Sequence, residues 1–299
     1  MRSLISINDL TKEEILEILK KATAFKRKGP ENLLKGSILA SCFFDPSTRT
    51  RLSFESAMLR LGGSVITVAD KNSTSVQKGE SLSDTMRVIG GYADIIVLRH
   101  PLEGSARLAA SVTSLPVINA GDGANQHPSQ TLLDLFSIQE SQGRLDELKI
   151  AFVGDLKYGR TVHSLALAAS LFNMRLYFVS PESLSLPRTT RQQLKIRDVN
   201  VSFHLSVDEL IDKVDVIYMT RLQKERFAEG ESHAPGGRFN LTLQKLQGAK
   251  KNLRILHPLP RVDELDPLID TTPFAYYFEQ AKNGLFVREA LLAFLLKRL

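Results

Sequence analysis

Short apolar runs separated by amphipathic segments recur along the chain in two series. Thr11 and Glu14 form a predicted capping box ahead of the first helical stripe, at residues 15–22. Short apolar strands that alternate with helices are typical of parallel sheets. The pattern therefore predicts an α/β protein with two parallel-sheet α/β domains. The predicted strands lie at 37–44, 64–68, 94–99 and 116–120 in the first series, and at 149–155, 175–180, 201–205 and 215–221 in the second.

The division between the two series falls near residue 134. We expect a first domain over 1–134 and a second domain over 135–286. The segment 287–299, VREALLAFLLKRL, predicts a C-terminal helix, whose packing partner the pattern alone does not identify.

Composition restricts the class of protein. The 299 residues are 43% hydrophobic and 24% charged, as in an ordinary globular protein. No run approaches the roughly 20 apolar residues of a membrane span, and the N-terminus lacks the apolar core of a secretory signal. The single cysteine, Cys42, excludes an intramolecular disulfide framework and a Cys-rich metal site, and its apolar surroundings predict a buried thiol. These features predict a cytoplasmic protein without a membrane partner.

The net charge of +6 comes from scattered lysines and arginines rather than from one basic block. Nucleic-acid-binding proteins usually present a clustered basic face, which a linear sequence neither shows nor excludes. We expect no nucleic-acid partner. The charge is compatible with a site for small anions, provided that the arginines converge on folding.

The stretch FFDPSTRTRLSF, residues 43–54, leads from an apolar strand into a helix. In open α/β sheets, ligands bind beyond the carboxyl ends of the strands, where helices begin. Ser47 or Thr48 is suited to cap this helix, but a cap needs one oxygen and does not explain Arg49 and Arg51. Unpaired N–H groups at a helix start, hydroxyls and a guanidinium together favour a phosphate site.

Two other turns of the first half carry candidate chemistry. Arg99 ends a strand that the pattern predicts to be buried, where a charged side chain requires a partner. His127 and Gln130 lie at a predicted helix start; a lone histidine is usually structural, but the company of Arg99 favours stabilisation of a carbonyl oxygen. The polar loop 73–84 fits a solvated surface, or a mobile cation at Lys78 that closes over an anion.

The second half offers cations suited to carboxylates. Arg160 opens a predicted helix, where a cation opposes the helix dipole, so a reason outside the helix is expected. Arg221 and Gln223 follow a predicted strand. The sequence HPLPR at 257–261 contains two prolines, which predict an extended backbone whose carbonyls accept hydrogen bonds from an amine or amide. We therefore expect a cleft between the two domains that joins a small phosphorylated substrate to a small acidic one.

Taken together, the motifs STRTR, RHP, HPSQ, GDLKYGR, RLQKER and HPLPR resemble those of the carbamoyltransferase family, in order and over almost the whole chain. The resemblance implies two α/β domains, with the C-terminal helix 287–299 packed back on the first. It implies a carbamoyl phosphate-binding domain over 1–134, an aspartate-binding domain over 135–286, and no metal or organic cofactor.

The resemblance also assigns site residues. Arg99 would reach the phosphate and the carbonyl oxygen, and His127 would polarise that carbonyl. The implied carbamoyl phosphate site is Ser47, Thr48, Arg49, Thr50, Ser75, Lys78, Arg99, His127, Gln130, Leu259 and Pro260. The implied aspartate site is Lys78, Arg160, Arg221 and Gln223. The implied catalytic residues are Thr50, Lys78, Arg99 and His127.

In this family a serine and a lysine of one loop enter the neighbouring subunit's site, which implies a homotrimer with shared active sites. Lys78 matches the lysine, and Ser75 is the best match for the serine among the hydroxyls at 73–75. A regulatory chain as a further partner stays open. Two departures from the family pattern are Asp45, where a glutamate is usual, and Glu279, where a basic residue is expected.

The resemblance implies transfer of the carbamoyl group of carbamoyl phosphate to the α-amine of L-aspartate, a step of pyrimidine biosynthesis. The ornithine branch of the family is the nearest alternative, and it typically has SMG and HCLP where this chain has RLQ and HPLP. Arg221 would also repel a cationic side chain, which favours aspartate. A non-catalytic anion-binding protein is the alternative from a different class.

Overall fold

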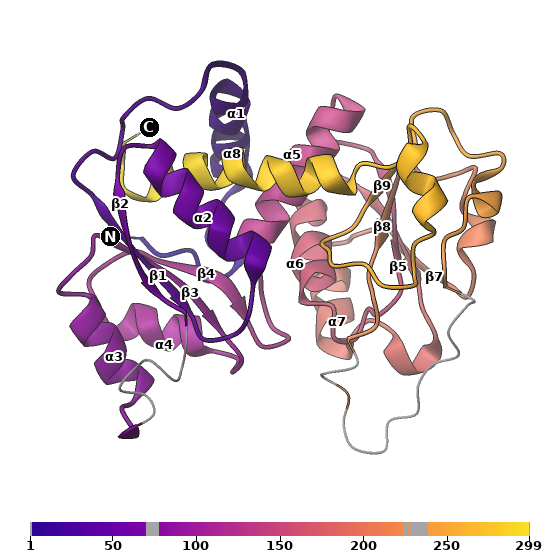
Figure 1. The fold of residues 1–299 in the computed structure, drawn as a ribbon. Helices are drawn as coiled ribbons and strands as arrows, with labels where there is room; N and C mark the ends of the chain where they lie inside the picture. Colours follow the sequence, from indigo (N-terminus) through magenta and orange to yellow (C-terminus); the bar gives the residue numbers. More distant parts are fainter. Residues whose placement is uncertain (1, 70–77, 224–226, 228–238, 299) are drawn as a thin grey trace. The chain divides into compact units, whose positions relative to one another are not determined.

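The computed structural model describes residues 2–69, 78–223, 227 and 239–298, and the chain forms two compact units. Unit 1 comprises Met1–Phe136 and Lys282–Leu299, and unit 2 comprises Ser137–Ala281 (Figure 1). The two boundaries fall inside the helices α5 (Pro128–Gln142) and α8 (Tyr277–Leu295). The prediction of a cleft concerns the placement of the two units and stays a prediction.

Within its described residues, unit 1 contains a four-stranded parallel sheet in the order β2-β1-β3-β4. Alternate residues of β1 and β3 point to opposite faces, as the period of two requires. Ala40 and Cys42 pack on one face against α3 and α4, whereas Ser41 donates to Glu55 of α2 on the other (Figure 1). The strands are β1 (Ile38–Phe43), β2 (Ser64–Val68), β3 (Ile95–His100) and β4 (Val117–Asp122).

The helices of unit 1 begin where the sequence provides caps. Thr11 and Glu14 form the predicted capping box of α1, and Gly29 ends that helix at φ 76°, a conformation that glycine adopts without strain. Ser81 caps α3 through the N–H of Asp84. These helices are α1 (Lys12–Lys28), α2 (Thr48–Arg60), α3 (Leu82–Ile89) and α4 (Ser105–Val112), and unit 1 also holds the first part of α5 and most of α8.

In the described part of unit 2, five parallel strands follow the order β7-β6-β5-β8-β9. One face packs on short 3-10 segments and on Tyr277, while α6 and α7 lie against the other (Figure 1). The strands are β5 (Lys149–Val153), β6 (Arg175–Val179), β7 (Val201–His204), β8 (Val216–Met219) and β9 (Arg254–Leu256), and the helices are α6 (Arg160–Ala169) and α7 (Arg188–Ile196).

The six described 3-10 segments are short connections between these elements. They are η1 (Ile7–Asp9), η4 (Ser170–Phe172), η5 (Glu182–Leu184), η6 (Val207–Glu209), η8 (Gln244–Leu246) and η9 (Pro267–Thr271).

The predicted α/β class with two parallel-sheet domains is confirmed, and each of the eight predicted strands is present. Three elements were not predicted: β9, α4 and α7. Helix α8 starts at Tyr277, earlier than the predicted start at residue 287. Cys42 is buried as expected, and burial raises the pKa of its thiol to about 12.

Candidate active site

Each sheet has one point where the chain reverses its direction of winding. In unit 1 that point lies between β1 and β3, because β2 follows on one side and β3 on the other. Ligands bind at such switch points, beyond the carboxyl ends of the strands. The predicted phosphate turn leaves β1 there, and Arg99 lies opposite Phe43 at the end of β3.

The turn 44–47 leads directly into α2, and Thr48, Arg49 and Thr50 belong to the first turn of that helix. Ser47 occupies the N-cap position, but its side chain makes no capping hydrogen bond. Thr50 is buried, whereas Thr48 and Arg49 are exposed. The alternative prediction, in which Ser47 serves only as a helix cap, is therefore wrong. The N–H groups that open the helix, with the hydroxyls beside them, form an arrangement suited to an anion.

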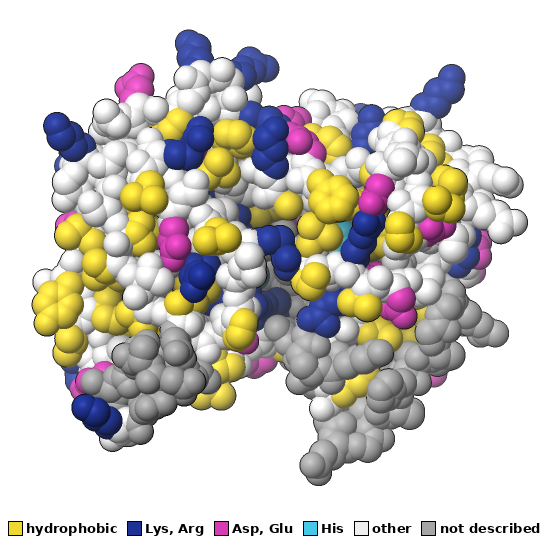
Figure 2. Space-filling model, viewed as in Figure 1, with side chains coloured by type: hydrophobic (Ala, Val, Ile, Leu, Met, Phe, Trp, Pro, Cys, Tyr) yellow, Lys and Arg dark blue, Asp and Glu magenta, His cyan; other side chains and the backbone are white. Residues whose placement is uncertain are grey.

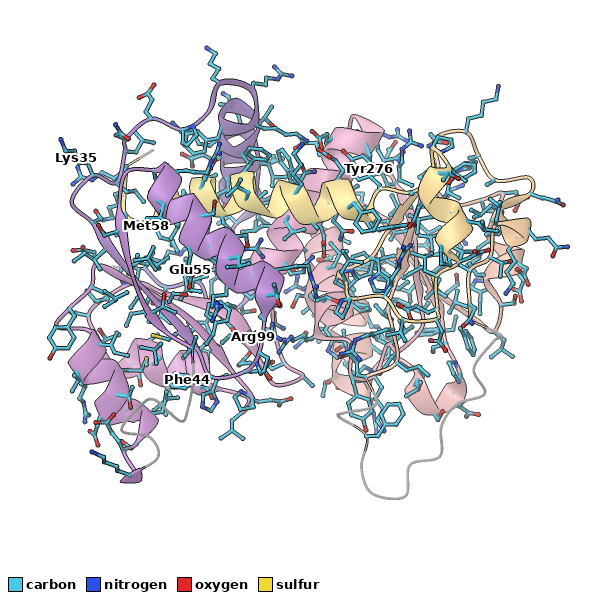
Figure 3. All side chains as sticks on the ribbon, in the orientation of Figure 1. Lys35, Phe44, Glu55, Met58, Arg99 and Tyr276 are labelled. Carbon is cyan, nitrogen blue, oxygen red and sulfur yellow. The ribbon has the colours of Figure 1, made fainter. Side chains whose placement is uncertain are left out.

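Arg99 is fixed by contacts inside unit 1. Its Nε donates to Asp45 Oδ2 at 2.8 Å, and its Nη1 donates to the carbonyl of Ala120 at 3.5 Å. Figure 3 shows Arg99 beside the N-terminal end of α2. Asp45, the residue at which the chain departs from the family pattern, thus holds an arginine of its own unit.

His127 and Gln130 lie at the start of α5, which follows the next strand of the sheet, β4. Both are buried. The Nδ1 atom of His127 is 3.4 Å from Ser129 Oγ, and Gln130 Nε2 donates to Asp134 Oδ1 at 2.8 Å. Because β1, β3 and β4 are parallel neighbours, the phosphate turn, Arg99 and His127 follow the same edge of one sheet.

In unit 2 the winding reverses between β5 and β8. The predicted carboxylate-binding residues follow these two strands: Arg160 opens α6 after β5, and Arg221 and Gln223 follow β8. Arg160 is buried although it begins a helix. Arg221 Nη1 donates to the carbonyl of Leu222 at 2.9 Å. The structure therefore brings the three residues to the carboxyl ends of adjacent strands.

Asp155 joins these two segments and was not predicted as a site residue. Its Oδ1 accepts hydrogen bonds from the N–H groups of Lys157 and Tyr158, and its Oδ2 accepts one from the N–H of Gln223 at 3.0 Å. Asp155 is fully buried. The sequence does carry a signal for it, because an acidic residue directly after a buried strand needs partners.

The segment after β9 holds the predicted residues Leu259 and Pro260. The predicted extended backbone is wrong at Leu259, which has φ 56° and so lies in the left-handed region. The side chain of His257 explains how this conformation is held, because its Nδ1 accepts the N–H of Leu259 at 2.8 Å. The opposite ring nitrogen contacts Glu264 Oε1 at 2.7 Å.

These two bonds define the state of the buried pair. Because Nδ1 accepts the backbone N–H of Leu259, Nε2 is the nitrogen that donates to Glu264. Burial alone would raise the pKa of Glu264, but the hydrogen bonds from His257 and from backbone N–H groups lower it below its usual value. Glu264 therefore acts as an ionised anchor for the segment 257–264.

Replacing Glu264 by glutamine is expected to lower the free energy of unfolding at pH 7 by about 1.5–3 kcal/mol, the usual worth of a hydrogen bond to a charged group. The pKa of Glu264 is lower in the folded state than in the unfolded state. The stabilisation that the ionised side chain gives to the fold is therefore fully present above the unfolded pKa of about 4.3. That contribution is lost as the pH falls through the folded pKa. Urea denaturation of both proteins at neutral and acidic pH measures the difference.

Asp212→Asn is the matched control, because Asp212 is an exposed acid of the same unit. It should leave the stability and its pH dependence nearly unchanged. A stability difference for Glu264→Gln that is the same at neutral and acidic pH would show that Glu264 is not an ionised anchor.

The remaining predicted residues belong to the loop before α3. Lys78 is exposed, and Ser75 lies outside the described residues. Among the described residues, no group of three or more His, Cys, Asp or Glu side chains is arranged to hold a metal ion. No described helix is long and apolar enough to cross a membrane. On the viewed face, Lys and Arg side chains alternate with hydrophobic and acidic ones (Figure 2).

The sequence matches known carbamoyltransferases in both halves. The carbamoyl-P binding domain of the aspartate/ornithine carbamoyltransferases matches residues 2–140, and their Asp/Orn binding domain matches residues 146–295. An aspartate carbamoyltransferase catalytic subunit from Chromobacterium violaceum is 52% identical over 295 residues, covering 99% of this chain and 98% of that protein. Catalytic subunit 2 of the Shewanella halifaxensis enzyme is 53% identical over 296 residues, covering 99% of this chain and 96% of that protein.

Solved structures agree with these matches. The catalytic subunit of M. jannaschii aspartate transcarbamoylase superposes with a TM-score of 0.91 at 55% identity, covering 99% of this chain and 98% of that one. The Trypanosoma cruzi enzyme in complex with carbamoyl phosphate and aspartate gives a TM-score of 0.92 at 37% identity, covering 97% and 95%. The chain therefore belongs to the aspartate/ornithine carbamoyltransferase family.

Proposed function

We propose that this protein transfers the carbamoyl group of carbamoyl phosphate to the α-amine of L-aspartate, giving N-carbamoyl-L-aspartate and phosphate. The observation that carries the proposal is the distribution of cations over the two winding reversals. A phosphate-type turn with Arg99 follows β1 and β3, and Arg160 with Arg221 follows β5 and β8. The first set suits a phosphate and the second suits carboxylates.

Unit 1 would hold carbamoyl phosphate. The N–H groups at the start of α2 and the hydroxyls of Ser47, Thr48 and Thr50 bind the phosphate, with Arg49 as a further cation. Arg99 reaches both the phosphate and the carbonyl oxygen, and its contact with Asp45 fixes the direction of its guanidinium. His127 donates a hydrogen bond to the carbonyl oxygen.

Unit 2 would hold L-aspartate. Arg160, Arg221 and Gln223 bind its two carboxylates, and Asp155 fixes the backbone of Gln223 for this purpose. The backbone carbonyls near Leu259 and Pro260 accept hydrogen bonds from the amino group of the carbamoyl moiety. The two buried bonds of His257 hold these carbonyls in place.

The chemistry proceeds without a covalent enzyme intermediate. The uncharged α-amine attacks the carbonyl carbon, a C–N bond forms, and negative charge develops on the carbonyl oxygen. The C–O bond to phosphate then breaks, its electron pair leaves with the phosphate, and the leaving phosphate takes up the proton that the nitrogen loses. Arg99 and His127 stabilise the oxyanion, and the turn 47–50 stabilises the leaving phosphate.

The proposal includes a homotrimer in which Lys78 and Ser75 of one subunit complete the site of the next. The exposure of Lys78 supports this role. A regulatory chain stays open as a further partner; the Chromobacterium violaceum relative is named a catalytic subunit. A solution mass measurement of the purified protein tests the trimer.

An assay for the ureido product tests the activity directly. We expect product from carbamoyl phosphate with L-aspartate, and at least tenfold less with L-ornithine at equal concentration, because about 1.4 kcal/mol of discrimination suffices for that ratio. A preference for ornithine would reassign the acceptor within the family. No product with either amino acid would leave only a binding role for the two anion sites.

A further inference from the structure

Three polar side chains of unit 1 are buried and interact: Gln130 and Asp134 of α5 are hydrogen-bonded, and Arg288 of α8 is attracted electrostatically to Asp134. Their exposed fractions are 8%, 0% and 3%. A buried charge is costly unless it is paired, so Asp134 and Arg288 need an explanation. Of the three, only Gln130 belongs to the implied carbamoyl phosphate site, where the family resemblance has it hold the carbamoyl amino group together with the backbone carbonyls near Leu259 and Pro260.

The contact between Gln130 and Asp134 fixes how the amide is turned. The residues are one helical turn apart, and Gln130 Nε2 donates to Asp134 Oδ1 at 2.8 Å. An ionised carboxylate only accepts hydrogen bonds. If the amide were flipped, two oxygen atoms would face each other. Asp134 therefore holds the NH₂ end of Gln130 and leaves the carbonyl oxygen directed elsewhere.

The guanidinium of Arg288 attracts the carboxylate of Asp134 in the core. Burial lowers the pKa of Arg288 to about 10, and the attraction of Asp134 acts in the opposite direction, so the guanidinium stays charged at neutral pH. The guanidinium also lies over the ring of Phe54, at 5.0 Å from its centroid. Phe54 belongs to α2, the helix that begins with the phosphate turn.

Gly284 makes room for this arrangement. A Cβ atom at position 284 would lie 2.2 Å from Arg288 Nη1, so any larger residue would displace the guanidinium. The geometry is therefore specific to a buried arginine on α8 next to a glycine one turn earlier.

We propose that Asp134 is a positioning residue, which fixes the Gln130 amide so that its oxygen accepts a hydrogen bond from the carbamoyl amino group. The inference rests on the proposed function, because it gives Gln130 its substrate contact. It also explains the orientation of the Gln130 amide, which could direct either its NH₂ group or its oxygen to the substrate. The bond to Asp134 occupies the NH₂ group and leaves the oxygen for the substrate.

Asp134→Asn tests the orientation with little change in volume. The positive charge of Arg288 draws the asparagine oxygen, so the asparagine NH₂ faces Gln130 and turns the Gln130 amide around. A donor then faces the carbamoyl amino group. We expect the affinity for carbamoyl phosphate to fall roughly 5- to 150-fold, because a buried hydrogen-bond donor left without an acceptor costs about 1–3 kcal/mol.

Inorganic phosphate is the discriminating probe, because it has no amino group. Its affinity should change less than about twofold in Asp134→Asn, which is within the 0.5 kcal/mol of an unaffected site. Equal losses for phosphate and carbamoyl phosphate would mean that Asp134 supports the fold of the site and does not orient Gln130. Gln139→Ala, on the same helix, is the control and should change neither affinity.

A double-mutant cycle with Gln130→Ala separates this inference from the proposed function. If Asp134 acts through Gln130, then Asp134→Asn has little further effect in the Gln130→Ala background. Equal effects in both backgrounds would overturn the inference and leave the proposed function standing. If Gln130→Ala alone leaves carbamoyl phosphate affinity unchanged, the assigned contact of Gln130 fails first.

The stability of each variant is measured in parallel, because Asp134→Asn leaves Arg288 less well paired. If that variant does not fold, Asp134→Glu replaces it in the cycle. It keeps the charge and moves the carboxylate by one methylene, so we expect the same selective loss of carbamoyl phosphate affinity, smaller in size. Unchanged affinity in a folded Asp134→Glu, with Gln130→Ala impaired, would contradict the inference.

Discussion

Replacing His127 by alanine is expected to lower turnover about 100- to 1,000-fold, the usual effect of removing one donor to a developing oxyanion. His127 is buried at the start of α5, after β4, at the same sheet edge as the phosphate turn. Its hydrogen bond strengthens as charge develops on the carbonyl oxygen. The loss should therefore appear in kcat, while binding of carbamoyl phosphate largely persists.

Steady-state kinetics of the ureido product, together with direct binding of carbamoyl phosphate, measure the two effects. His204→Ala is the control, because His204 lies on the edge strand β7 and contacts Ser202 and Glu209. It should retain nearly full turnover. Near-normal turnover of His127→Ala would remove His127 from the catalytic residues.

Replacing Arg221 by alanine is expected to weaken binding of L-aspartate far more than binding of carbamoyl phosphate. The loss of a hydrogen bond between charged groups is worth about 1.5–3 kcal/mol, which corresponds to roughly 10- to 150-fold in affinity. Arg221 follows β8 in unit 2, whereas the phosphate turn belongs to unit 1. The KM for aspartate reports the change.

Arg188→Ala is the matched control, since Arg188 is an exposed arginine at the start of α7 in the same unit. It should leave both KM values unchanged. Comparable losses of affinity for both substrates in Arg221→Ala would contradict the assignment of one substrate to each unit.

The sequence predicted the sheets because most of their strands are rich in apolar residues, as in ILASCF of β1 and RLYFV of β6. Strand β9 was missed because it comprises only Arg254–Leu256, which is too short to show the alternation of buried and exposed residues typical of a strand. The candidate site was predictable where a charged residue lies at the end of a buried strand or just beyond it, as at Arg99 and Arg221. Such a residue must find a partner whatever the rest of the fold does.

The residues that support the site were not predictable in the same way. Asp134 and Arg288 are far apart in sequence, and each reads locally as one charge on an amphipathic helix; only packing shows both to be buried. The left-handed conformation of Leu259 depends on the ring of His257, which local preferences do not encode. Proline patterns alone therefore gave the wrong backbone there.

Because residues 282–298 belong to unit 1, they set the order in which the two units complete their folding during synthesis on the ribosome. Unit 2 is one uninterrupted stretch of chain and can fold as soon as it has emerged. Unit 1, by contrast, is incomplete until α8 has been synthesised. Before that point it lacks Arg288, which attracts Asp134, and Glu289, which accepts a hydrogen bond from Arg60. Unit 1, most of which is synthesised first, therefore completes its folding last. Until then, the apolar surface on which α8 packs is accessible to chaperones.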